Sequence, residues 1–411
     1  AATLSQPQTI FFSKSGDYEN MDDGYHETVA DDDAIVYTIA SNQVNAIRFM
    51  TATRTLIIGT AGGEFAVSGG GTDIAITPTN ILIKKQSNNG AANVDALAVG
   101  NATIFLQRAK RKLRELAYNF DVDGYLAPDL TILAEHISEG GFKQLSYQQE
   151  PNQIIWCVRN DGQLAGLTYQ REQQVVAWHR HIFGGSFGSG NAVCDSVATI
   201  PTDDSEYQTW VIVKRTINGA TKRYIEYIHE YDFDETDDTS FNFLDSQLSY
   251  DGSAASTISG LAHLEGQTVS ILANGAAHPN KVVSSGEVVL ERSATKVKIG
   301  LPYTSLLQTM RIDAGSQNGT SQSKTKRIYE ITARLYESIG IEIGPDLDNM
   351  ERIPFRSSAN LMDSGVNVFT GDKDIEFRGN YETDGFIFVR QNQPLPLTVL
   401  SLYPRLVTND G

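Results

Sequence analysis

The feature of this sequence that most constrains its fold is a repeat of about fifty residues built from short strand-like runs. Apolar runs rich in Val, Ile, Tyr, Phe and Thr recur between Gly, Asn and Asp turns, and no long segment keeps the 3.6-residue period of a helix. The second runs of four successive copies are centred on Ile57, Phe105, Ile155 and Val211, so their spacings are 48, 50 and 56 residues. Such a period, with four strands per copy, is typical of β-propeller blades.

The strands of the four copies can be placed by residue number. First strands are expected at 45–50, 94–99, 142–147 and 193–200. Second strands are expected at 55–59, 103–107, 153–158 and 209–214, and third strands at 64–69, 113–120, 163–170 and 223–231. The first three copies add a fourth strand at 76–85, 129–137 and 174–182. We predict an all-β chain, a β-propeller of four-stranded blades; a β-sandwich is the rival, because its turns recur every 8–12 residues.

The repeat breaks at Tyr250, and this break predicts three regions. Residues 1–250 are predicted to form propeller blades, with clear repeats from about residue 45. Residues 251–313 contain short strands with Asn-Gly and Ser-Gly turns, which predict a small β-barrel or sandwich inserted between blade strands. Strand patterns then resume, so residues 314–411 are expected to return to the propeller and close it.

Charge and cysteine content narrow the functional classes. Fifty Asp and Glu against 33 Lys and Arg give a formal charge of −17, opposite in sign to a general nucleic-acid binder. A DNA conduit, which must not hold DNA tightly, is still allowed. Cys157 and Cys194 cannot make a disulfide framework, which fits assembly in a reducing compartment. No apolar run approaches the length of a membrane span, and we expect no signal peptide.

No grouping of residues predicts a catalytic, cofactor-binding or metal site. Residues 184–188 match G-x-S-x-G, but a strand comes next where a nucleophile elbow needs a helix, so we interpret them as an inter-blade loop. His179 and His181 share one strand face and could reach one metal, but no third ligand is evident. A solvated or interface strand end is the favoured interpretation of this pair. We therefore expect no enzyme.

Two acidic loops and one basic cluster are the strongest charge features. The acidic loops lack EF-hand spacing and are interpreted as solvated; they contain Asp31, Asp32, Asp33, Asp232, Asp234, Glu235, Asp237 and Asp238. The basic cluster is predicted to lie on one face of a strand, and its members are Arg108, Lys110, Lys112 and Arg114. Phosphate contact is one role for it. Pairing with acidic loops of a neighbouring subunit is the favoured one, because no aromatic residues interleave to stack bases.

Aromatic residues offer a further binding hypothesis. Trp156 and Trp178, with Tyr147 and Tyr169, could form a sugar-binding platform. Aromatic residues at period-two spacing in a propeller are more often core residues, and we favour the core interpretation. The two cysteines lie in or beside apolar strands and are expected to be small buried residues.

Four stretches of the chain resemble a known family. They are QPQTIFFSKSGDYENM (6–21), RKLRELAYNFDVDGYLAPDLTILAEHI (111–137), QIIWCVRNDGQLAGLTYQREQQVVAWHRH (153–181), and SGLAHLEGQTVSILANGAAHPNKVV with KIGLPYTS (259–305). With the terminal QNQPLPLTVLSLYP, they make the chain similar to the tail-tube nozzle proteins (tail tubular protein B) of short-tailed bacteriophages and related prophage tail proteins.

The resemblance implies a propeller decorated by small β domains in a homohexameric tube at the distal end of the virion tail. It implies a conduit and gate for genome delivery, assembled in the bacterial cytoplasm, with tail adaptor and tail fibre proteins as partners. DNA is expected only as transient cargo, and no membrane insertion is expected. In relatives a platform region precedes TIFFSKSGDY; because this chain begins at Ala1 without Met, we expect it to be a piece of a longer protein.

The family role assigns a use to the acidic loops and leaves two alternatives open. An acidic lumen repels DNA phosphates, so the loops at 31–33 and 232–238 are candidate lumen residues. The first alternative is a propeller adhesin or lectin for host-surface glycan, which requires exposed aromatic residues around Trp156 or Trp178. The second is a tail-associated glycan hydrolase, which requires paired carboxylates in a cleft.

Overall fold

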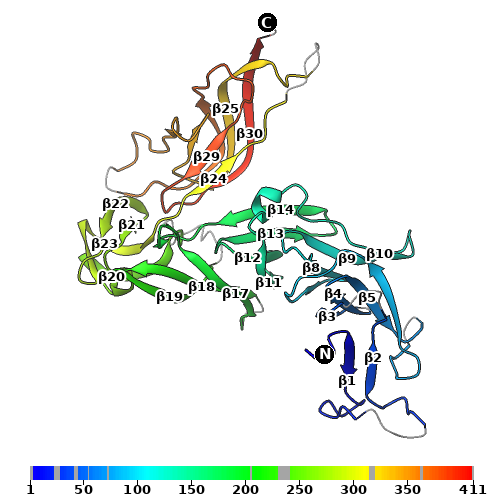
Figure 1. Cartoon of the computed structure of the whole chain (residues 1–411). Coiled ribbons are helices and arrows are strands. Elements are labelled where there is room, and N and C mark those ends of the chain that lie inside the picture. The colour runs from blue at the N-terminus through cyan, green and yellow to red at the C-terminus, as the bar shows by residue number, and fades with distance from the viewer. Residues whose placement is uncertain are drawn as a thin grey trace. The chain divides into compact units, whose positions relative to one another are not determined.

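The computed structural model describes residues 3–22, 28–40, 45–53, 55–71, 74–203, 206–229, 241–313, 320–361 and 364–409. Nearly all regular structure in these ranges is β-strand (Figure 1). The only α-helix in the described ranges is α1 (Glu135–Ser138), of four residues. The prediction of an all-β chain is therefore confirmed.

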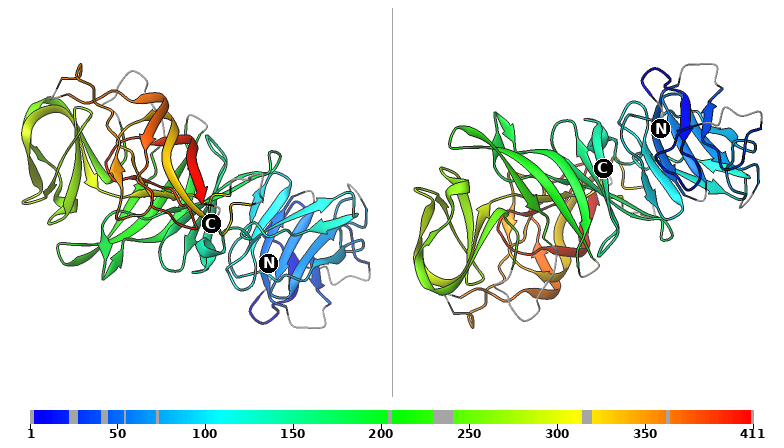
Figure 2. Two further views of the ribbon diagram at one scale, coloured as in Figure 1. Left: turned by 90° about the horizontal axis from the view of Figure 1, so that it is seen from above. Right: turned by 90° about the horizontal axis from the view of Figure 1, so that it is seen from below.

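Three four-stranded antiparallel sheets follow one another along the chain, as the repeat predicts (Figures 1 and 2). The first contains β3 (Ile47–Ala52), β4 (Leu56–Thr60), β5 (Gly63–Ser68) and β6 (Leu82–Ser87). The second contains β7 (Leu97–Val99), β8 (Ala102–Leu106), β9 (Leu113–Asn119) and β10 (Gly124–Leu126). The third contains β11 (Phe142–Gln148), β12 (Ile154–Arg159), β13 (Leu164–Gln170) and β14 (Val175–His181). Spatial order follows chain order in each sheet, which is the blade organisation of a β-propeller.

A further sheet of three strands carries the fourth copy of the repeat. It is ordered β17 (Val193–Pro201), β18 (Tyr207–Ile217) and β19 (Ala220–Tyr227). Two short hairpins add β1 (Thr9–Phe12) with β2 (Ile35–Thr38), and β15 (Ser186–Phe187) with β16 (Gly190–Asn191).

The blades bury apolar side chains on both faces of their central strands. Residues of β4, β8 and β12 are buried along almost their whole length, which explains why these strands are continuous apolar runs rather than alternating ones. The second and third blades share one core, in which Ile104 of β8 and Ile155 of β12 are fully buried. Phe142 stacks on Trp178 within that core, with ring centroids 5.6 Å apart.

The predicted fourth strand at 129–137 is wrong. The second blade takes its outer strand from β10, and the later residues form a turn and then α1. The carboxylate of Asp129 accepts hydrogen bonds from the backbone N–H and the hydroxyl of Thr131, at 2.9 and 2.5 Å. Such a side-chain-closed turn competes with an extended strand, so the apolar residues after it do not continue the sheet.

The chain divides into two compact units, which are described separately. One unit comprises residues 1–181 and 193–213, and the other comprises residues 182–192 and 214–411. The second unit contains a sheet ordered β20 (Asp245–Ser259), β23 (Glu287–Leu301), β21 (Thr268–Ala273) and β22 (Ala276–Val282). These strands surround their own apolar core. The sheet starts and ends earlier than the 251–313 segment expected from the sequence.

The last part of the chain is strand-rich, as expected, but its topology is not that of a blade. One sheet is ordered β28 (Phe369–Glu376), β25 (Thr325–Ser338) and β30 (Thr398–Asn409). The other is ordered β24 (Ser305–Gln308), β29 (Phe388–Gln391), β26 (Glu342–Gly344) and β27 (Glu351–Arg352). Both sheets contribute to one core. The expected return to a blade meander at 314–411 is wrong here, because strands distant in sequence pair directly and two apolar faces bury each other.

Candidate functional site: the basic hairpin of the second blade

The basic cluster lies mainly in the turn between β8 and β9. Arg108 and Lys110 fall between the two strands, and the Lys110 N–H donates to the Gln107 carbonyl at 2.7 Å. Gln107 N–H in turn donates to the Lys112 carbonyl at 2.9 Å and closes the hairpin. Lys110 has a φ of +63°, which a turn accepts and a strand does not. The predicted strand face shared by Arg108, Lys110, Lys112 and Arg114 is therefore wrong.

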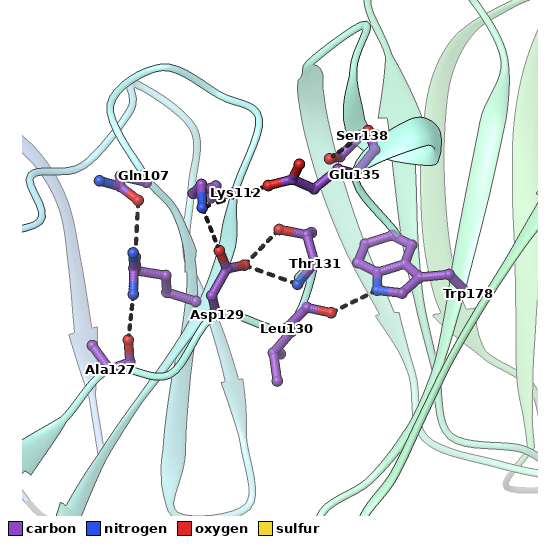
Figure 3. A network of polar contacts seen from close by, with 10 residues as sticks. Gln107, Lys112, Ala127, Asp129, Leu130, Thr131, Glu135, Ser138 and Trp178 are labelled. Carbon is purple, nitrogen blue, oxygen red and sulfur yellow. Dashed lines mark hydrogen bonds and ion pairs between the residues drawn. The ribbon is translucent and has the colours of Figure 1, made fainter. Parts of the chain in front are cut away.

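Two of the four predicted basic residues are held inside a polar network (Figure 3). The Lys112 ammonium lies 2.8 Å from Oδ2 of Asp129 and 3.9 Å from Oε1 of Glu135. Burial alone would raise the pKa of Asp129, but its bonds from Lys112 and Thr131 outweigh that effect and lower the pKa. Asp129 therefore carries a negative charge in its ion pair with Lys112. This ion pair holds the segment before α1 against the hairpin between β8 and β9.

Arg114 is engaged in the same way. Its Nε donates to the side-chain oxygen of Gln107 at 2.9 Å, and its Nη1 donates to the Ala127 carbonyl at 2.6 Å. Arg114 on β9 therefore links the residue that follows β8 to the residue that follows β10. The cations left for an external ligand are Arg108 and Arg111, which are exposed, and Lys110, which is half-buried. None of the three has an ion-pair partner among the described residues.

Asp129→Asn is expected to lower the free energy of unfolding by about 1 kcal/mol, because a charge-assisted bond to a partly exposed lysine is weakened. Urea titration with circular dichroism detection measures the change. Glu135→Gln is the matched control: its side chain is 68% exposed and its Oε1 lies 3.9 Å from the lysine ammonium, so no measurable loss is expected. Equal losses in the two variants would contradict the dominant role of Asp129 in holding Lys112.

The acidic loop at 31–33 divides into one anchored and two exposed residues. Asp33 is buried; its Oδ1 lies 3.0 Å from the Lys14 ammonium and its Oδ2 accepts from the Ala30 N–H at 2.8 Å. Asp31 is exposed and accepts from the Thr79 hydroxyl at 3.0 Å, and Asp32 is exposed. Only the exposed pair presents a surface charge. The other predicted acidic residues, Asp232, Asp234 and Asp237, lie outside the described residues.

The histidine pair lies at the end of β14, where both side chains are half-buried, and the interpretation as a solvated or interface strand end stays a prediction. Nδ1 of His179 lies 2.7 Å from Nε2 of His181, and Nε2 of His179 lies 3.3 Å from the Thr168 hydroxyl. Both rings meet the edge or face of Trp156, with centroids 6.0 and 5.1 Å away. Burial lowers the pKa of both imidazoles, that of His181 to about 3, with a further contribution from its neighbour. Both histidines are therefore neutral at pH 7 and serve as packing groups.

The aromatic residues proposed as a sugar platform lie in or against the third blade's core. Trp156 is 3% exposed, and its indole N–H donates to the side-chain oxygen of Gln148 at 3.0 Å. Trp178 donates to the Leu130 carbonyl at 2.8 Å (Figure 3). Tyr169 is buried, and its hydroxyl donates to Glu115 at 2.7 Å. The observed packing agrees with the core interpretation.

A buried polar network in the second unit was missed by the sequence analysis. Arg215 is completely buried; its two Nη atoms donate to the carboxylate of Glu226 at 2.5 and 3.0 Å, and its Nε donates to the Gly184 carbonyl at 2.8 Å. The Gly184 N–H donates to Asp245 at 2.6 Å, and Ser246 donates to Glu226 at 2.8 Å. Burial raises the pKa of Asp245 to about 6, although the Gly184 N–H and Arg215 oppose the shift.

The network explains the glycine-rich loop that matches G-x-S-x-G. A Cβ on Gly184 would lie 2.8 Å from Cβ of Leu301, so the close approach requires glycine. The short hairpin of β15 and β16 comes next in the chain, not a helix, which agrees with the loop interpretation. One signal for the network was available in the sequence: Arg215 occupies the same alternating register as Val211, Val213 and Ile217, all of which are buried.

Within the described ranges, no group of three or more His, Cys, Asp or Glu side chains is placed to hold a metal ion. No helix there is both long enough and apolar enough to cross a membrane. Both cysteines are buried, and burial raises the pKa of Cys194 to about 12. A thiol with so high a pKa is a poor nucleophile near neutral pH.

Comparison with known proteins assigns the chain to no family. No protein-family model matches the chain, and no curated protein does. Among solved structures, the chain is similar to an auxiliary nutrient binding protein from Bacteroides thetaiotaomicron, with a TM-score of 0.28 and 8% identity over 66% of this chain. It covers 62% of that protein's length. A chain of an S. cerevisiae Dbp5 complex that also contains Gle1 gives a TM-score of 0.26 at 7% identity, over 95% of this chain and 87% of that one.

Proposed function

We propose that this chain is a structural component of a phage or prophage tail tube, the distal nozzle through which the genome is delivered. The observation that carries the proposal is that charged and polar side chains in both units hold strands together. Lys112 and Arg114 fasten the second blade, the two histidines pack on Trp156, and Arg215 is enclosed with Glu226. Polar side chains that hold strands rigidly together suit a tube wall, which must keep its shape while DNA passes.

Charge supports the same proposal. The formal charge of −17 disfavours tight retention of a polyphosphate, and two aspartates of the loop at 31–33 are exposed. The sequence stretches that resemble nozzle proteins lie in both units, so the resemblance does not depend on the blades alone. The adhesin alternative requires an exposed aromatic platform, and Trp156 is buried. No observation in the described residues favours the hydrolase over the structural role.

Immunogold labelling and mass spectrometry of purified virions test this function. We expect antibody against the chain to label the distal end of the tail, and peptides from both units to be found in virions in several copies per particle. The matched control is antibody against a capsid protein of the same phage, which should label heads alone. Absence of the chain from virions, together with binding of the free protein to a host glycan array, would overturn the proposal.

A further inference from the structure

The two ends of the second blade carry opposite charges. Strand β9 connects a turn containing Arg108, Lys110 and Arg111 to a turn containing Asp121 and Asp123. Successive turns of an antiparallel meander lie at opposite ends of the strand they share. The seven residues of β9 separate them by about 20 Å. One blade therefore presents a positive end and a negative end.

The negative end also presents apolar side chains in a fixed turn. Phe120 is 87% exposed and Val122 is 58% exposed. The side-chain oxygen of Asn119 accepts hydrogen bonds from the N–H groups of Asp121 and Val122, at 2.8 and 3.4 Å. The Tyr118 hydroxyl donates to Asp123 at 2.6 Å. An exposed phenyl ring on an ordered turn loses little conformational entropy on binding, which is the property of an interface anchor.

The positive end presents apolar side chains as well. Ile132 and Leu133 are 68% and 92% exposed. Their segment lies beside the start of β9, because the Leu130 N–H donates to the Leu113 carbonyl at 2.9 Å and Lys112 pairs with Asp129 at 2.8 Å (Figure 3). The two ends of the blade thus combine apolar groups with charges of opposite sign.

A buried guanidinium next to the positive end lacks acceptors. Arg159 at the end of β12 is 8% exposed, and its Nη2 donates to Asp161 at 2.6 Å. Its Nε and Nη1 have no hydrogen-bond partner in the described part of the chain. The guanidinium lies against Gly140, and two residues further the Phe142 N–H donates to the Lys110 carbonyl at 2.8 Å. These two donors are buried and do not face an incoming carboxylate, so the cations that a carboxylate can reach at this end are Arg108, Lys110 and Arg111.

We propose that the second blade is a head-to-tail contact between copies of this chain. The β9–β10 turn of one copy, with Phe120 and its flanking aspartates, docks on the basic hairpin of the next copy beside Ile132 and Leu133. A contact between two different surfaces repeats, and it closes into a ring when the rotation permits. The inference rests on the proposed function, because a tube wall is built from repeated copies. A second copy fits better than DNA, whose phosphates offer nothing apolar to Ile132 and Leu133.

Sedimentation equilibrium of charge-changed variants tests the contact. Wild type is expected to associate, whereas R108E/R111E and D121K/D123N each raise the dissociation constant at least about tenfold. Asn at position 123 keeps a residue that tolerates the left-handed φ of +46°. F120S is expected to weaken association by a similar factor, because it removes the apolar contact made by the phenyl ring. K84E/K222E, which changes exposed lysines elsewhere, is the matched control and should associate like wild type.

Mixing gives the decisive result. The first variant has two acidic ends and the second has no acidic end. Each variant alone therefore associates more weakly than wild type, but an equimolar mixture should assemble in alternation. Wild-type-like association of every variant, or failure of the mixture with both partners folded by circular dichroism, overturns the contact and leaves the tube function standing. The proposed contact is also overturned if the wild-type protein stays monomeric at about 1 mM. The tube function is then tested separately by immunogold labelling of virions. DNA binding that R108E/R111E abolishes, with association unchanged, assigns the hairpin to nucleic acid instead.

Discussion

Replacing Arg215 with methionine is expected to lower the free energy of unfolding by about 3–5 kcal/mol, because a buried charge loses its only strong partner. Arg215 is fully buried and makes two hydrogen bonds to Glu226 and one to the Gly184 carbonyl. Methionine fills a similar volume but donates no hydrogen bond. The Glu226 carboxylate, whose side chain is 17% exposed, is then left without its counter-ion. Urea titration with circular dichroism detection measures the loss.

Two controls separate the ion pair from general disruption of the sheet. Lys222→Met, on an exposed position of the neighbouring strand β19, should change stability by less than about 0.5 kcal/mol. The double change Arg215→Met with Glu226→Leu should recover much of the loss, because it removes the orphaned carboxylate as well. A double variant as unstable as the sum of its two single variants would show that the pair is not coupled.

Acidification is expected to destabilise the first unit through its histidine pair. Burial lowers the pKa of His181 to about 3, whereas an imidazole in the unfolded chain titrates near 6.5. The unfolded state therefore binds more protons below pH 6.5, and stability falls as pH decreases from 6.5 towards the folded pKa. Between pH 6.5 and 4.5, His181 alone accounts for about 2–3 kcal/mol of that loss. The lowered pKa of His179 acts in the same direction.

The variant H179Q/H181Q isolates this effect, because it keeps polar side chains that do not titrate. The free energy of unfolding of wild type minus that of the variant should fall as pH drops from 6.5 to 4.5 and stay constant above pH 7.5. Asp245 titrates over an overlapping range with the opposite sign: its folded pKa is raised, so its burial penalty shrinks as pH falls. That contribution is present in both proteins and cancels in the difference. A pH-independent difference would refute the assignment.

The class of the fold and the blade strands could be predicted from the amino-acid sequence alone. A strand that is covered on both faces must be apolar throughout, so β4, β8 and β12 could be recognised from local composition, and their spacing marked the repeat. The glycine loop at 184–188 could likewise be interpreted from the strand pattern of the residues after it. These conclusions depend on residues that are adjacent in the sequence, so one amino-acid sequence is sufficient to reach them.

Only the three-dimensional fold shows which partners the polar side chains have and which distant strands pair. Lys112 and Arg114 look like part of one basic patch in sequence, yet Asp129 and Ala127 hold them, and this leaves a smaller positive end. The pairing of β25 with β30 joins segments some sixty residues apart, and no local pattern distinguishes it from a blade meander. Charge partners and strand pairing are settled by burial and geometry across the fold, because an unpaired buried charge or an open strand edge is costly wherever its partner lies in the chain.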